Sequence, residues 1–182
     1  MAAYRSLARW TSLNEQSVAA QLPLDAASGK LVQSVLDSVK QSLDGRSFTT
    51  TDKGMLYVSV QLLLVNVRIT DPGKSGSYFY IIFMSLPSAA GATNAVSEVG
   101  TIRSFEVNAA LQRAHSKPGL GSGKRGGAQL SFPITLSLKK LAPLGQAGVI
   151  VSFVRASGAH SASGDVIIIG EARLELSPDP VE

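Results

Sequence analysis

The sequence predicts a mainly β domain, an antiparallel β-sandwich or jelly-roll-like barrel of six to eight strands with one N-terminal amphipathic helix. After residue 55, runs rich in β-branched and aromatic residues alternate with polar residues. Turn residues separate these runs. Strand-like and helix-like segments do not alternate, so a parallel sheet is not expected.

Length and composition fit one domain. The chain has 182 residues, which is typical of a single domain with a sizeable core. Charged residues make up 16%, below the usual quarter, while the 45% of hydrophobic residues is ordinary. Low charge together with many small residues suggests that neighbouring molecules cover part of the surface. A bland soluble protein is the alternative.

Several classes of protein are excluded. The chain has no cysteine, so disulfides, cysteine zinc sites and thiol nucleophiles are not expected. No long uncharged apolar run predicts a transmembrane segment, and the first ten residues lack the apolar core of a secretory signal. The net charge of +4 permits contact with RNA, a nucleocapsid or an anionic membrane surface, but requires none of them.

Residues 1–24 are interpreted as an N-terminal arm and residues 25–182 as a single β-rich domain. Leu7, Trp10 and Leu13 are spaced like one face of a short helix. These three side chains are candidates for contact with a partner subunit. The alternative is that the arm packs on the core of its own domain.

A helix is predicted over residues 28–43, with Ser28 or Asp25 as its cap and Gly45 after its end. One face of this helix carries the apolar side chains Leu31, Val32, Val35, Leu36, Val39 and Leu43. This face is expected to pack on a sheet.

Two long apolar runs, residues 55–69 and 77–86, are joined by the turn-forming residues 71–76 and predict a β-hairpin. In the first run the apolar positions change from even to odd numbers. Since side chains alternate faces along a strand, this change predicts a bulge near residues 62–64, passage into a second sheet, or burial of both faces.

Further strands are predicted at residues 46–52, 101–107, 130–138, 148–154 and 165–177, with residues 148–154 buried on both faces. Residues 87–100 are interpreted as a loop. Residues 116–127 contain many glycines and form a predicted mobile basic loop, in which Lys117, Lys124 and Arg125 are candidates for binding a polyanion. A plain surface loop is the alternative. The spacing of a nucleotide-binding phosphate loop is absent, because Arg125 follows Lys124.

No catalytic, cofactor-binding or metal-binding residues are predicted. The two histidines, His115 and His160, are far apart in the sequence and lie in polar segments. The serines near His160 do not form a nucleophile elbow. The chain is therefore expected to be non-enzymatic and to need no cofactor.

Residues 148–178 contain an apolar strand, a small-residue loop, a strand with a glycine followed by alternating residues, and a proline. This segment resembles the end of the jelly-roll coat proteins of small plant RNA viruses, tymovirus-like coats in particular. Residues 130–138 and 55–86 resemble the preceding strands of such coats. The resemblance implies a virion protein that associates with itself and contacts RNA, in the virion and the host cytoplasm. The long basic arm of many such coats is absent.

Two other viral classes are also similar. Movement proteins of the thirty-kilodalton superfamily are single β-domains with a helix ahead of long strands. Matrix proteins of the rhabdovirus type are small, basic and self-associating, and bridge nucleocapsid and membrane. In such a matrix protein, residues 116–127 would correspond to a loop that bridges neighbouring copies. A cellular β-sandwich binding module, located in the cytoplasm, is the non-viral alternative.

Overall fold

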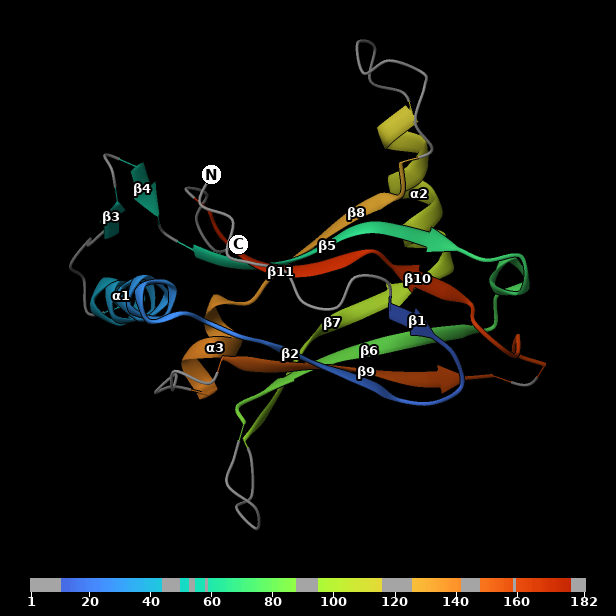
Figure 1. Cartoon of the computed structure of the whole chain (residues 1–182), viewed down its shortest axis with the longest axis horizontal. Coiled ribbons are helices and arrows are strands. Elements are labelled where there is room, and N and C mark those ends of the chain that lie inside the picture. The colour runs from blue at the N-terminus through green and yellow to red at the C-terminus, as the bar shows by residue number, and fades with distance from the viewer. Residues whose placement is uncertain are drawn as a thin grey trace.

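The computed structural model describes residues 11–43, 50–52, 55–57, 59–87, 95–115, 126–141, 148–158 and 160–177. Two antiparallel sheets lie face to face as a β-sandwich (Figure 1). Sheet 1 contains β1 (Thr11–Leu13), β10 (Ile167–Ile169), β5 (Ser59–Ile69), β11 (Glu171–Ser177) and β8 (Ala128–Pro133). Sheet 2 contains β2 (Val18–Leu22), β9 (Val149–Ser157), β6 (Tyr78–Ser85) and β7 (Val96–Arg103). The predicted fold class is confirmed.

The strand pairing is that of a jelly roll. β10 and β11 both pair with β5 and are separated only by Gly170, so they are two halves of one strand. The two large sheets then contain eight strands, which are in chain order β1, β2, β5, β6, β7, β8, β9 and the combined β10–β11. The first of these strands pairs with the last (β1 with β10) and the second with the seventh (β2 with β9). The third pairs with the sixth (β5 with β8) and the fourth with the fifth (β6 with β7). This nested pairing is one long antiparallel ribbon wrapped into two four-stranded sheets.

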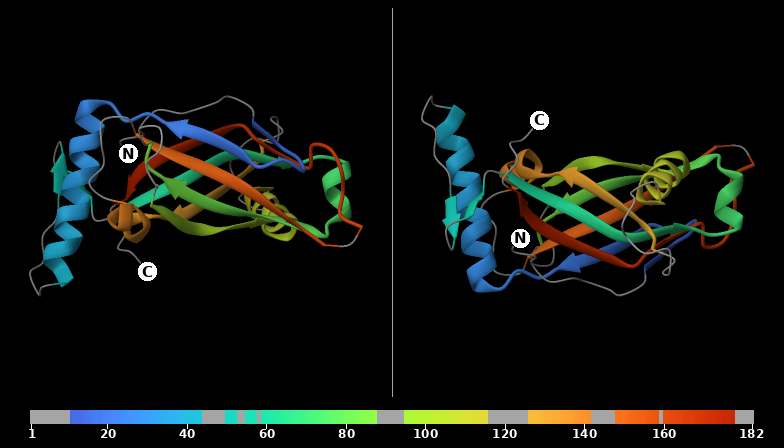
Figure 2. Two further views of the ribbon diagram at one scale, coloured as in Figure 1. Left: turned by 90° about the horizontal axis from the view of Figure 1, so that it is seen from below. Right: turned by 90° about the horizontal axis from the view of Figure 1, so that it is seen from above.

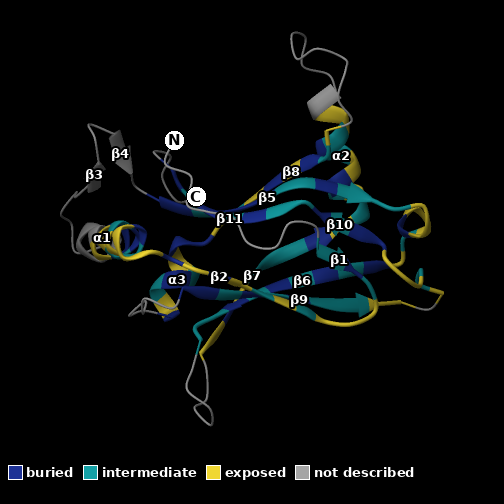
Figure 3. Cartoon of the chain, viewed as in Figure 1, coloured by how far each residue is buried: buried dark blue, intermediate teal, exposed yellow. Residues whose placement is uncertain are grey.

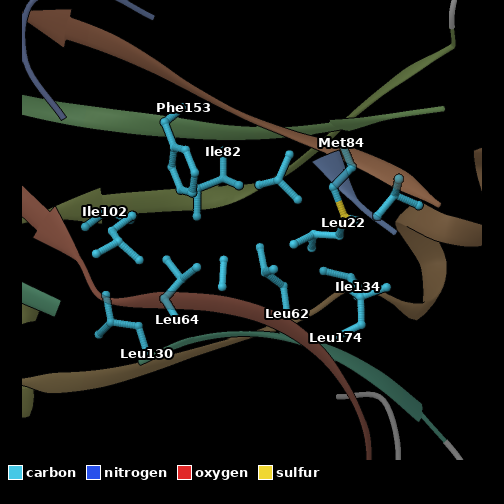
Figure 4. Packing of buried hydrophobic residues seen from close by; sticks show 14 of the residues in the cluster. Leu22, Leu62, Leu64, Ile82, Met84, Ile102, Leu130, Ile134, Phe153 and Leu174 are labelled. Atoms are coloured by element: carbon cyan, nitrogen blue, oxygen red, sulfur yellow. The ribbon is translucent and has the colours of Figure 1, made fainter. Parts of the chain in front are cut away.

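The core lies between the two sheets and is apolar. Leu62 and Leu64 of β5 point toward Ile82 and Met84 of β6, and all four side chains are fully buried (Figure 4). Colouring by burial shows the same inner layer along both sheets (Figure 3). Burial of apolar surface contributes about 25 cal/mol per Å², so this layer supplies most of the driving force for folding.

Helix α1 (Ala26–Leu43) lies across one end of the sandwich (Figure 2). It begins two residues earlier than predicted. Asp25 provides the cap, since its Oδ1 accepts a hydrogen bond from Ser28 N at 2.7 Å. Val32, Val35 and Leu36 are buried, which confirms the predicted apolar face for the side chains described there. Beside α1, β3 (Thr50–Asp52) pairs with β4 (Met55–Tyr57) in a separate two-stranded sheet. β3 lies within the predicted strand of residues 46–52. β4 is the start of the predicted strand of residues 55–69, which the structure divides into β4 and β5.

The predicted hairpin is wrong. β5 and β6 are both strands, but they belong to different sheets and do not pair. The connection contains a 3-10 helix, η1 (Pro72–Ser75), at the end of the sandwich opposite α1 (Figure 2). Stacked sheets are about 10 Å apart, which this short connection can span. The turn residues between the two strands therefore predicted that the chain reverses its direction. They did not predict which strands β6 pairs with.

Two predicted strands are cut short by helices. β7 ends at Arg103 and α2 (Ser104–His115) follows, where the sequence predicted a strand over 101–107. The Glu106 carboxylate caps α2 by accepting a hydrogen bond from Arg103 N at 3.1 Å. β7 begins at Val96, within the predicted loop of 87–100.

The second of these helices is α3. The predicted strand over 130–138 ends at Pro133, and α3 (Thr135–Leu141) takes over. Ile134, Leu138 and Leu141 are buried at helical spacing, and they close one end of the core. Together α2 and α3 correct the expectation of a single helix.

The change of face in β5 is caused by a bulge at Asn66, which has a left-handed φ of 58°. The register with β8 shifts between Leu64 and Val67, and both of these side chains point into the core. Gly127, the residue before β8, donates its N–H to Asn66 Oδ1 at 2.9 Å. The bulge lies slightly later than the predicted residues 62–64. At those residues Leu62, Leu63 and Leu64 are all buried, so the predicted alternative of burial on both faces holds there.

Candidate interaction surface

Most of the residues predicted to bind partners lie outside the described residues. These are Lys117, Lys124 and Arg125 of the basic loop, and Leu7 and Trp10 of the arm.

Leu13 is described and is 0% exposed, because it lies in β1 and points into the core. Residues 11–13 form a strand, not the end of a helix. For Leu13, the alternative interpretation of an arm that packs on its own domain is the correct one.

The most polar cluster of the described interior is centred on Arg155. Its guanidinium lies over the ring of Tyr78, with its central carbon 5.1 Å from the ring centroid, and Nη2 donates a hydrogen bond to Ala162 O. Tyr80 donates its hydroxyl hydrogen to Asn14 O at 2.6 Å. Burial raises the pKa of Tyr80 to about 12 and also raises that of Tyr78. Both phenols therefore stay protonated at neutral pH and tie strand ends together.

Nothing in the described part of the chain groups three or more side chains that could bind a metal. His160 is exposed, and the side chain of His115 lies outside the described residues. Of the helices in the described ranges, none is long and apolar enough to cross a membrane.

The outer face of sheet 1 is polar on β8 and β11, while Leu63 and Val65 of β5 also lie on this face. On β11, Arg173 forms ion pairs with Glu171 and Glu175, at 3.4 Å and 3.6 Å. On the neighbouring strands, Ser131 Oγ donates a hydrogen bond to Gln61 Oε1 at 2.5 Å. An antiparallel sheet usually has one buried face and one wet, polar face, and on β8 and β11 sheet 1 follows this rule.

The outer face of sheet 2 carries an apolar strip along β6 and β9, interrupted by Ser85 and Ser152 and flanked by polar residues of β7 and β2. The strand register places the following side chains on it: Phe79, Ile81 and Phe83 of β6, and Ile150, Val154 and Ala156 of β9. All six are partly exposed. Helices α1 and α3 lie at one end of the sandwich and α2 lies above sheet 2, so the described helices leave its lower surface uncovered (Figure 1). We call this surface the apolar face.

The large hydrophobic side chains that are most exposed border the apolar face. Val96 at the start of β7 is 61% exposed, and Phe105, just after its end, is 78% exposed. Leu136 is 51% exposed and belongs to α3, which packs on β7. A hollow of about 500 Å³ lies beside Phe105, lined by Ser77, Tyr78, Phe79, Arg103, Ser104, Phe105 and Gly158.

Two charges stand on β7 at opposite ends of the apolar face. Glu98 lies opposite Phe83, and Arg103 lies opposite Phe79. The Arg103 guanidinium lies over the Phe79 ring, 5.8 Å from its centroid. Both charged residues are exposed, and neither forms an ion pair with another described residue.

Sequence analysis missed the apolar face, although its signal is present. Residues 78–85 are apolar at every position except Ser85. That pattern was taken as half of a hairpin, and residues 148–154 as a strand buried on both faces. The structure corrects the second interpretation, since Ile150 and Val154 are only partly buried.

No family model matches the chain, and no curated protein is significantly similar to it.

Proposed function

We propose that this chain is a viral structural protein that associates with copies of itself into a shell or layer and does no chemistry. The observation that carries the proposal is the uncovered apolar face of sheet 2. The largest exposed apolar patch of a protein is often a site of interaction.

The outer surface of sheet 2 sets the size of a possible interface. Its four strands, spaced about 4.8 Å apart and some seven residues long at about 3.3 Å per residue, cover roughly 450 Å², of which β6 and β9 make up about half. Val96, Phe105 and Leu136 extend this area at its border. Core positions of interfaces are depleted in charge and enriched in aromatic residues, and Phe79 and Phe83 fit that composition.

The viral part of the proposal rests on analogy of fold. Jelly rolls occur in viral capsids, lectins and cupins. Between the two sheets the described side chains are mostly apolar, and Arg155, Tyr78 and Tyr80 are among the polar exceptions. Because a fold hosts many functions, the virion class stays a hypothesis that the assembly experiments must test.

Sedimentation velocity at micromolar concentration, over a range of salt and pH, tests self-association. We expect species larger than the monomer, and electron microscopy of the same samples should show shells or regular arrays. A protein that stays monomeric throughout would overturn the proposal and favour a cellular β-sandwich binding module.

Further measurements would distinguish a matrix protein from a coat or movement protein. Flotation with anionic liposomes would favour a matrix protein that bridges nucleocapsid and membrane, because basic surfaces bind such membranes. For a coat or a movement protein we expect binding of RNA instead. If Lys117, Lys124 and Arg125 contact phosphates, their removal should reduce the salt dependence of RNA binding. An unchanged dependence would remove the loop from that role.

A further inference from the structure

We propose that two copies of this chain pair through the apolar face about a two-fold axis, with Glu98 of each copy facing Arg103 of the other. The proposal rests on the proposed self-association and adds the surface and its geometry. Two-fold contacts use the same patch on both copies, so the patch must be complementary to itself. Charge, shape and apolar area on the apolar face each meet this condition.

The charges on the apolar face are complementary under a two-fold rotation. Glu98 and Arg103 lie opposite Phe83 and Phe79, which are four residues apart on β6, so about 13 Å separates the two levels. The midpoint is the pair Ile81 and Thr101. A two-fold axis across the strands at this level exchanges the two ends of the face. Each carboxylate then lies over a guanidinium of the other copy.

The shape of the two ends of the apolar face is also complementary under this rotation. Val96 lies opposite Ser85, two residues beyond Phe83 on β6. The same two-fold rotation carries Val96 to the level two residues beyond Phe79, which is that of Ser77. Ser77 lines the hollow beside Phe105. An exposed side chain at one end of the face thus meets a hollow at the other end.

The apolar centre completes the match. Under this rotation Ile81 and Val154 meet their own copies, and Phe79 meets Phe83. Packed sheets of this kind lie about 10 Å apart with their strands within about 30° of each other. The face would bury roughly 900 Å² in total, which is below the 1,200 to 2,000 Å² of stable complexes. A dimer that dissociates in the micromolar range, and that a larger assembly reinforces, is therefore expected.

A charge swap tests the pairing. Glu98→Arg and Arg103→Glu each place like charges face to face, and each should weaken dimerisation at least tenfold in sedimentation equilibrium. The double variant restores opposite charges and should return to within about threefold of the wild type. Both residues are exposed, so the fold should tolerate these changes. If the single variants dimerise like the wild type, or the double variant is as weak as the singles, this geometry is overturned.

A second variant tests the face without relying on the charge pair. Ile81→Lys places a charge at the two-fold axis and should abolish the dimer. Gln129→Lys is the matched control, since it adds the same charge at an exposed strand position on sheet 1 and should leave dimerisation unchanged. Thermal unfolding shows whether each variant is folded. If the wild type assembles and Ile81→Lys assembles equally, another surface is used and only this inference fails. If the wild type never assembles, the proposed function fails as well.

Discussion

Replacement of Thr135 by valine tests the junction between β8 and α3, where sequence analysis failed. Thr135 is fully buried, and its Oγ1 accepts a hydrogen bond from Val60 N at 2.8 Å. The same hydroxyl lies 3.3 Å from Val60 O and donates to it. A side chain thus continues the ladder of hydrogen bonds after β8 has ended. Valine has nearly the same shape, so Thr135→Val removes these bonds without opening a cavity.

The expected loss of stability is about 2 kcal/mol. A buried N–H left without an acceptor costs about 1–3 kcal/mol. For a domain of this size, that corresponds to a fall in melting temperature of about 4–8 °C. Urea unfolding at 25 °C measures the free energy, in dilute protein so that self-association does not contribute.

Thr135→Ser is the matched control for this experiment. Serine keeps the hydroxyl and loses only a methyl group, so its cost should be smaller than that of valine. If Thr135→Val unfolds within about 0.5 kcal/mol of the wild type, the hydroxyl does not hold β5 to α3 in the way described. The same conclusion follows if the serine variant is the less stable of the two.

Two further predictions concern stability. Burial raises the pKa of Tyr80 to about 12. Because unfolded tyrosine titrates near 10, its contribution is complete below pH 10 and falls by roughly 2 to 3 kcal/mol by pH 12. The stability of Tyr80→Phe should fall less over this range, and equal slopes in pH-dependent urea unfolding would contradict the assignment. Gly127→Ala should destabilise by more than about 2 kcal/mol, since its Cβ would lie 2.4 Å from the Asn66 carbonyl carbon. Gly29→Ala is the control: it has open space within α1 and should stabilise by about 1 kcal/mol, and equal effects would refute the crowding argument.

Local patterns predicted most of the elements. Alternation predicted β8 and β11, the spacing of Val32, Val35 and Leu36 predicted α1, and the change of phase in β5 predicted its bulge. These features depend on side chains that are close in sequence. Pairing depends on distant residues, and a period of two shows which face a residue occupies but not the neighbouring strand. For that reason the hairpin between β5 and β6 was predicted wrongly, while the fold class was right.

The two missed helices have a different cause. Residues 130–138 alternate between apolar and polar throughout, and nothing in a period of two marks the change at Pro133. Pro133 is the last residue of the strand. The buried residues Ile134, Leu138 and Leu141 have a helical spacing that competes with the alternation. The contact with Val60 favours the helix, and that contact is formed only in the folded chain.

A strand that is apolar on both sides indicates that both sides are covered. It does not indicate whether the same chain or another molecule covers them, and for this reason the apolar face was not predicted. Sequence analysis assigned the cover to the chain itself for residues 148–154. In the structure, the described helices leave the outer side of β6 and β9 open, and the proposed pairing would cover it with a second copy. The polar outer face of sheet 1 then limits the assembly. Its ion pairs at Arg173 favour contact with water, so under the proposed pairing we expect stacking to stop after two copies and not to continue as a fibre. A shell would therefore be built from such dimers, joined through the edges and ends of the sandwich.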